Sequence, residues 1–225
     1  MKLKQIPSGF NYFLTTVKCG AENILCRPVR FIGNSTFLAS PELRRRWHRI
    51  KMDSLRISKK IRVVSNPKKI EECSEKRLEF YTNYASAVSG TLKRPTFQRF
   101  LNWIIKREAI EKKAVKDIQV RVFPFEKKNG NFLAGRCNNE GIIQIFPKRR
   151  SVLQKKLQKH TKEKVRFYLK SRAIAALIHE VLHLKYEGNE SKVRQLTKKY
   201  FSTFFHNQDV NSERVESVKS MLFSN

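Results

Sequence analysis

The chain has 225 residues, enough for one domain of ordinary size with extensions, and 40% of them are hydrophobic, so a core can form. Its 48 lysines and arginines outnumber its 19 aspartates and glutamates and give a formal net charge of +29. This composition excludes a disordered polyampholyte and favours polyanionic partners such as nucleic acid, the ribosome or an anionic membrane surface. A general basic bias of the host proteome is the alternative explanation.

Cysteine usage and hydropathy indicate the compartment. The cysteines are scattered, without the spacing of a zinc ribbon or a disulfide framework: Cys19, Cys26, Cys73 and Cys137. No apolar run reaches the roughly 18 residues of a membrane span, and the N-terminus lacks an apolar signal core. We therefore expect an intracellular protein, cytoplasmic or nucleoid-associated. A basic, acid-poor start is also compatible with an organellar transit segment.

The first part of the chain predicts an extension followed by helices. Residues 1–69 are predicted to form a basic N-terminal extension, irregular or weakly β, with a strand over 60–65. Helical spacing of apolar residues predicts a helix over 70–87 and a second one from Pro95 to Lys113. The domain proper is therefore expected to span residues 70–225.

The pattern then changes from helical to alternating. Strands are predicted over 118–122, 132–134 and 141–147, and turn signals between them indicate a small antiparallel sheet. Residues 151–164 are polar and cationic, and fit either a helix or a solvated loop. The fold class is therefore α+β.

The C-terminal part predicts three helices, over 165–186, 190–205 and 211–223. The first is apolar nearly all round between Ile174 and Leu184, as in a helix buried on several sides. Asn189 is expected to cap the second.

The buried helix carries the motif His179-Glu180-Val181-Leu182-His183. Positions four apart lie on one helix face, so His179 and His183 can present two imidazoles to one metal ion. Glu180 lies about 100° around the axis, where it can reach a water on that metal and act as general base. The motif therefore predicts a Zn²⁺ site that activates water. Two satisfied core histidines, or a charged helix face, are the alternative interpretation.

A site of this type needs a third protein ligand and an open fourth position. Glu190 is the preferred candidate, because a Gly188-Asn189 turn can fold its helix back over the metal and negative charge is favoured at a helix N-terminus. Glu187 is the second candidate, and Asn189 and His206 are further alternatives. Alternatively, Glu190 does not bind metal, and its negative charge only stabilises the N-terminus of the helix.

Two segments resemble a known family. Residues 179–193, which read His-Glu-Val-Leu-His-Leu-Lys-Tyr-Glu-Gly-Asn-Glu-Ser-Lys-Val, resemble the metal-binding segment of the SprT-like and YgjP-like zinc metallopeptidases. Residues 135–145, which begin Gly-Arg-Cys, resemble the Gly-x-Cys segment that precedes the active-site helix in that family. The chain departs from the family in having Glu190, after one extra loop residue, where a third histidine is usual. The family's tryptophan near the Gly-x-Cys segment is absent too.

The resemblance implies a zincin-like metallopeptidase domain in which a substrate strand pairs with one edge of the sheet. That edge is expected at Ile142, Ile143, Gln144 and Ile145. Such pairing recognises the peptide through backbone hydrogen bonds and suits a protease of loose sequence preference. An oxyanion-stabilising side chain is also expected near the metal, with three candidates: Arg136, Tyr186 and Tyr200.

The same resemblance and the charge point to one class of partner, because SprT-like enzymes are associated with cleaving proteins attached to DNA. Binding to nucleic acid without sequence specificity is predicted at two basic clusters: Arg44, Arg45, Arg46, Lys148, Arg149 and Arg150. Aromatic residues near basic ones could stack on bases or belong to the core: Trp47, Phe97, Trp103 and Phe125.

Three functions are compatible with these features. The first is a zinc metallopeptidase with a protein or peptide substrate located near nucleic acid. The second is a non-catalytic nucleic-acid- or ribosome-binding protein with a structural or vestigial metal site. The third is a hydrolase of a non-peptide amide or ester, which the same chemistry permits.

Overall fold

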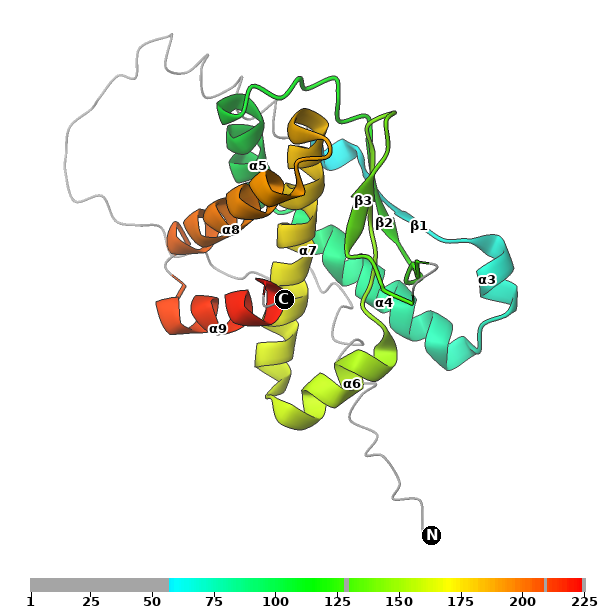
Figure 1. Ribbon diagram of the computed structural model, residues 1–225. Helices are drawn as coiled ribbons and strands as arrows, with labels where there is room; N and C mark the ends of the chain where they lie inside the picture. Colours follow the sequence, from blue (N-terminus) through cyan, green and yellow to red (C-terminus); the bar gives the residue numbers. More distant parts are fainter. Residues whose placement is uncertain (1–56, 128–129, 209, 224–225) are drawn as a thin grey trace, which may run out of the picture. The chain divides into compact units, whose positions relative to one another are not determined.

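The computed structural model describes residues 57–127, 130–208 and 210–223 (Figure 1). They belong to one compact unit, which spans Met52–Asn225. The predicted basic cluster at Arg44, Arg45 and Arg46 and the aromatic candidate Trp47 lie outside the described residues.

Helices and strands follow the mixed α and β composition expected from the sequence. Their order is β1 (Ile61–Val64), α3 (Pro67–Glu71), α4 (Glu75–Leu92), α5 (Pro95–Arg107), β2 (Asp117–Arg121), β3 (Gly135–Cys137), β4 (Ile142–Ile145), α6 (Arg150–Lys159), α7 (Lys162–Tyr186), α8 (Glu190–His206) and α9 (Ser212–Phe223). The helix predicted to reach Lys113 ends at Arg107, close to Ala109 with its φ of 50°. Among the helices described, none combines the length and apolarity needed to cross a membrane.

The sheet has four strands in the order β1-β2-β4-β3. The expectation of an antiparallel sheet is wrong, because β1 pairs with β2 and β2 with β4 in parallel, and only β3 and β4 are antiparallel. The expected boundary between residues 69 and 70 is also wrong, since β1 belongs to this sheet. Parallel strands need long connections, and here the helices between β1 and β2 provide one. The turn signals in the sequence mark only short connections, so they do not reveal the parallel pairing.

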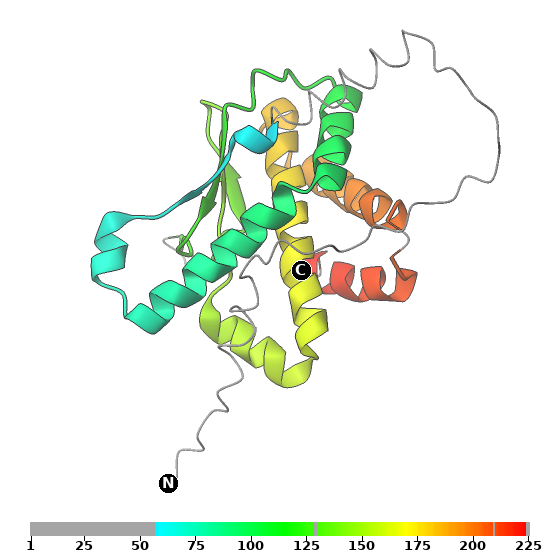
Figure 2. The same ribbon diagram turned by 180° about the vertical axis from the view of Figure 1, so that it is seen from behind.

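One face of the sheet forms the core. Ile61, Ile118 and Ile143 lie side by side in register and are at most 2% exposed. Helices α4 and α7 contact the strands, and α8 packs along α7. Figures 1 and 2 show α7 in the middle of this unit, with the sheet on one side and α8 and α9 on the other.

Helix α7 has the all-round burial that its sequence predicts, since Ala173, Ile174, Ala175, Ala176, Leu177 and Ile178 are all buried. It begins after Thr161, whose hydroxyl accepts the Lys164 N–H. The next helix, α8, begins after Asn189, whose side chain accepts the Lys192 N–H at 3.0 Å, as predicted.

A buried carboxylate ties the end of α7 to its neighbours. Glu108, just after α5, accepts a hydrogen bond at 2.6 Å from the hydroxyl of Tyr186 and another from that of Tyr200. Lys185 donates to its backbone carbonyl at 2.5 Å. Burial alone would raise the pKa of Glu108, but the two hydroxyls and the charges of Lys185 and Arg107 outweigh it and lower that pKa. These contacts fix the C-terminal end of α7 against α5 and α8.

Gly141, in the turn before β4, has no room for a side chain. Its φ is 77°, and a Cβ there would lie 1.8 Å from the carbonyl oxygen of Ala114. We expect Gly141→Ala to lower the free energy of unfolding by about 2 kcal/mol or more. Urea denaturation monitored by circular dichroism measures this loss.

Gly90 provides the matched control, because it lies within α4 and a Cβ there would meet nothing within 4 Å. Gly90→Ala should raise the free energy of unfolding by about 0.5–1 kcal/mol, since alanine loses less conformational freedom in a helix. Equal effects of the two substitutions would contradict the steric account of Gly141.

Candidate metal centre

Three ligand atoms converge where α7 meets the start of α8. His179 Nε2 lies 3.1 Å from His183 Nε2 and 3.6 Å from Glu190 Oε2, and His183 Nε2 lies 3.3 Å from that same oxygen. A tetrahedral ion with bonds of about 2.0–2.1 Å separates its ligand atoms by roughly 3.3–3.5 Å. The separations of these three atoms are close to this range, so the three residues could hold one metal ion.

The other ring nitrogens show which tautomer each histidine adopts. His183 Nδ1 lies 2.5 Å from the carbonyl oxygen of Glu187, which can only accept, so Nδ1 carries the proton. His179 Nδ1 lies 3.4 Å from the hydroxyl of Thr197, and that hydroxyl donates its own proton to the Val193 carbonyl at 2.7 Å. In their neutral form, both rings would present the lone pair of Nε2 to the same point, the arrangement that metal-binding histidines show.

Among the four candidates for the third ligand, Glu190 is the one that the structure brings to the histidines. Glu187 contributes its backbone instead: with φ of 40°, its N–H donates to the His183 carbonyl while its own carbonyl accepts from the His183 ring. Asn189 caps α8, and His206 lies at the far end of that helix.

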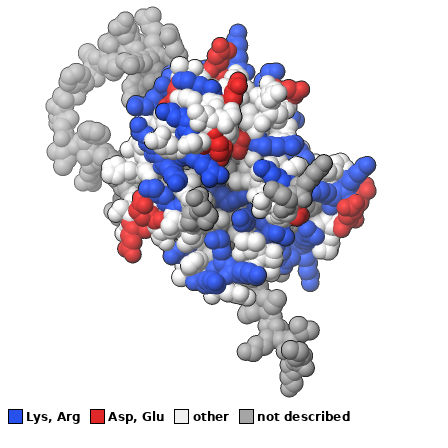
Figure 3. Space-filling model, viewed as in Figure 1, with Lys and Arg blue, Asp and Glu red and all other residues white. Residues whose placement is uncertain are grey.

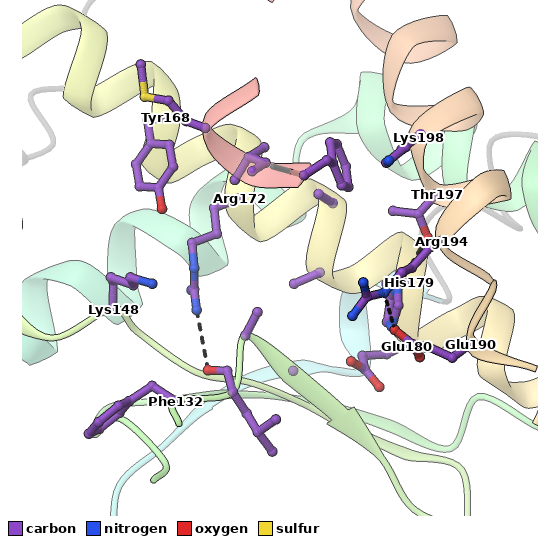
Figure 4. Close-up of a pocket in the computed structure, with 18 residues that line it drawn as sticks. Phe132, Lys148, Tyr168, Arg172, His179, Glu180, Glu190, Arg194, Thr197 and Lys198 are labelled. Carbon is purple, nitrogen blue, oxygen red and sulfur yellow. Dashed lines mark hydrogen bonds and ion pairs between the residues drawn. The ribbon is translucent and has the colours of Figure 1, made fainter. Parts of the chain in front are cut away.

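The carboxylate of Glu190 is shared between the histidines and an arginine one turn further along α8. Its Oε1 accepts from Arg194 Nε at 2.7 Å, which leaves Oε2 for the histidines (Figure 4). Burial would raise the pKa of Glu190, but Arg194 and the two histidines outweigh it and lower that pKa. Burial lowers the pKa of His179. An ionised carboxylate and neutral imidazoles are the forms that bind metal.

Glu180 lies beside this cluster, between α7 and β3, and is 6% exposed. A Cβ on Gly135 would come within 2.8 Å of Glu180 Cγ, so the strand can approach the helix only because residue 135 is a glycine. Burial, and next the charge of Glu190, raise the pKa of Glu180 to about 7, against a hydrogen bond from the Cys137 backbone. A carboxyl group with that pKa can both accept and return a proton near neutral pH.

Cys137 is a free thiol close to this carboxylate. Burial and the charge of Glu180 raise the pKa of its thiol to about 11. It therefore stays protonated at neutral pH, and its contribution to the centre is the backbone N–H that holds Glu180.

The centre opens into two cavities that share His179, Glu180, Glu190 and Arg194. The larger cavity, about 1010 Å³, extends over His183 and the turn after β3. The smaller cavity, about 500 Å³, extends along α7 towards α9. The cluster is thus accessible from both cavities.

The strand expected to pair with substrate is not at an edge. Ile142, Ile143, Gln144 and Ile145 form β4, which is paired on both sides, by β2 and by β3. The free edge next to the centre is β3 instead. Because Phe146 N–H bonds the Ala134 carbonyl and antiparallel ladders alternate, the backbone groups of Gly135 and Cys137 point away from β4.

The second predicted basic cluster does not form one surface. Lys148 lines the smaller cavity, whereas the guanidinium of Arg149 lies 3.9 Å from the centre of the Phe132 ring and that of Arg150 lies 5.6 Å from the Phe80 ring. Three consecutive residues therefore have three different surroundings.

Tyr186 and Tyr200 are not placed to stabilise an oxyanion, because both hydroxyls are bonded to Glu108 and neither residue lines the cavities at the centre. Arg136 lines only the larger of the two cavities, and its guanidinium lies 4.9 Å from the centre of the Phe125 ring. Arg194 lines both cavities, and sequence analysis missed it. Its signal was available: Glu190, Arg194 and Thr197 share one face of α8 at helical spacing.

Comparisons with models of protein families, with curated proteins and with solved structures found no match. The family resemblance seen in the sequence therefore stays a prediction. What the chain does has to be inferred from the geometry of this centre.

Glu180→Gln should stabilise the metal-free protein at alkaline pH. The carboxyl has a pKa of about 7 in the folded state against the usual 4.5, so ionisation disfavours folding, and wild-type stability falls as pH rises through this window. We expect the variant to gain on the order of 3 kcal/mol at pH 8, and much less at about pH 4. Urea unfolding of both proteins after chelation measures the difference, and a pH-independent difference would contradict the buried carboxylate.

Proposed function

We propose that this protein is a zinc metallopeptidase with a zincin-like centre, acting on proteins associated with nucleic acid. One observation carries the proposal. Two imidazole lone pairs and one carboxylate oxygen face each other at 3.1–3.6 Å, and their other atoms are held by Glu187, Thr197 and Arg194. Three acceptors so close repel each other unless a proton or a metal ion lies between them, and a zinc ion would bind all three at once.

Zinc at this position would supply a Lewis acid and a bound water of lowered pKa. Glu180 adjoins the ligands and can accept the proton of an attacking water and pass it to the leaving amine. Arg194 lines both cavities and can stabilise negative charge that develops on the substrate carbonyl. Each side chain of the centre then has a distinct task.

The free edge of β3 supports a peptide substrate. An extended peptide can add to it as a further strand through the outward N–H and carbonyl of Gly135 and the outward carbonyl of Cys137, whose N–H is bonded to Glu180. Both residues line the larger cavity together with Glu180, so the peptide backbone would pass directly beside the general base.

The basic surface supports the association with nucleic acid. Figure 3 shows that lysine and arginine cover much more of the face seen in Figure 1 than aspartate and glutamate. Exposed lysines on α6 and at the start of α7 add to the basic surface of the protein: Lys155, Lys159 and Lys162. Trp103 is 41% exposed beside the Arg107 guanidinium, whereas Phe97 is 1% exposed and belongs to the core.

Zinc stoichiometry tests the centre. We expect one zinc per chain in the wild type, none in His183→Ala, and weakened binding in Glu190→Ala, because each substitution removes one converging ligand. Thr197→Val should lower the zinc affinity by about 10- to 100-fold, since it removes only the support of the His179 ring. Elemental analysis and competition with a chromogenic chelator give these values.

Glu187→Ala is the control, because the residue contributes backbone atoms and not its carboxylate. It should keep its zinc. A wild type that holds no zinc after zinc addition and removal of the excess would remove the proposed function. If Glu187→Ala loses its zinc and Glu190→Ala keeps it, then Glu187 and not Glu190 is the third metal ligand.

Two variants test the chemistry while leaving the ligands in place. Glu180→Gln should retain zinc and lose proteolysis, as general base catalysis contributes roughly 10²–10⁴-fold. Gly135→Ala should also retain zinc, but lower kcat by about tenfold or more, because a misplaced carboxylate is a poor base. Casein cleavage by the zinc-loaded proteins is the assay. Cleavage undiminished in Glu180→Gln would exclude that residue as the base.

The basic surface also favours a second candidate, a polyanion-binding protein whose metal site is structural. It predicts salt-sensitive binding to nucleic acid and zinc uptake without hydrolysis of any substrate. Glu180 weighs against it, because a structural site has no use for a buried carboxylate that costs stability.

A further inference from the structure

The smaller cavity leads away from the metal centre along one face of α7. Tyr168, Arg172, Ala175, Ala176 and His179 all line it, and their spacing places them on one stripe of the helix. Arg172 lies seven positions before His179 on the helix, which corresponds to about 10 Å along the axis. Ala175 and Ala176 leave the space in between.

The far end of this cavity is cationic. The cations that line the whole cavity are Lys148, Arg172, Arg194 and Lys198, and the carboxylates on its lining are Glu180 and Glu190, which belong to the metal centre. Arg194 is paired with Glu190. Figure 4 shows Lys148 and Arg172 at one end of the cavity and the metal-centre residues at the other.

Arg172 is a buried cation that donates hydrogen bonds to carbonyl groups. It is 6% exposed and donates to the Phe146 carbonyl at 2.7 Å and to the Leu133 carbonyl at 3.3 Å. Burying a guanidinium without a carboxylate is costly, because dipoles only partly replace its hydration. An anion in the cavity would offset this cost.

Lys148 is a second cation that is partly buried in the wall of this cavity. Burial lowers the pKa of its ammonium group, and the charges that act on it in the same direction are those of Arg172, Lys156 and Arg149. A site where cations are held against their mutual repulsion is a site prepared for a negative ligand.

We propose that the smaller cavity is a subsite for an acidic side chain, aspartate or glutamate, of the peptide substrate. The proposal rests on the proposed function and names its substrate class. The alanines and the apolar residues Leu222 and Phe223 pack around the methylene groups, while Lys148 and Arg172 bind the carboxylate.

The location of the cavity favours a peptide over a nucleic-acid phosphate. Residues 132–135, which lead into the free edge of β3, line it, so a side chain of a peptide paired with that edge can enter. An extended peptide advances about 3.3 Å per residue, so the 10 Å to Arg172 corresponds to roughly two or three residues. The acidic residue is expected that far from the cleaved bond.

Matched peptides that differ only in Glu or Gln, at two or three residues on either side of the cleaved bond, test the subsite. With the zinc-loaded full chain we expect kcat/KM to fall at least about tenfold on the change to Gln at one of these positions. Lys148→Glu should abolish or reverse this preference. Lys199→Glu is the control, because Lys199 is exposed on α8 and does not line the cavity, and it should keep the preference.

Equal cleavage of the Glu and Gln peptides would overturn the subsite and leave the peptidase intact. If no peptide is cleaved, the proposed function fails, and calorimetry with zinc-loaded Glu180→Gln then decides the subsite alone: tighter binding of the Glu peptides supports it, and equal binding overturns it. Binding of a single-stranded oligonucleotide to the two variants tests the other ligand. If its affinity falls in Lys148→Glu but not in Lys199→Glu, the cavity binds phosphate, and the proposed subsite for an acidic side chain is overturned.

Discussion

Glu180 occupies the narrow space between helix α7 and strand β3, and much of the centre follows from the room that its carboxylate needs. Gly135 supplies this room, since any larger residue would meet Glu180 within 2.8 Å. The close approach also places the Cys137 N–H on the carboxylate and aligns the free edge of β3 with the histidines of α7. One contact between helix and strand thus sets the position and orientation of the Glu180 carboxylate relative to the histidines and to the edge of the sheet.

The parts of this structure that the sequence predicts are those governed by local spacing. The burial of α7, the pairing of His179 with His183 on one face and the cap at Asn189 all depend on neighbours within one or two helical turns. Glu190 could be selected because a short Gly188-Asn189 turn leaves few places for the start of the next helix. The electrostatic preference for a carboxylate at that position agrees with this geometry.

The parts that could not be predicted depend on contacts between distant segments. Strand β4 reads as an edge strand because its sequence shows only its turn to β3, whereas its other partner, β2, lies more than twenty residues upstream. Lys148 resembles its two basic neighbours in sequence, but the fold turns it into a cavity, and Arg149 onto an aromatic ring. The role of Arg172 is likewise invisible until the two carbonyls it binds have been brought together.

Glu187 adopts φ of 40° and ψ of −113°, a backbone region that residues with a side chain rarely occupy and that costs about 1–3 kcal/mol. This conformation is what turns its carbonyl onto His183. In the proposed metal centre, any energy that this turn recovers by relaxing would be subtracted from the affinity for the ion. The strength of binding would thus depend on a residue that supplies only backbone atoms to the centre.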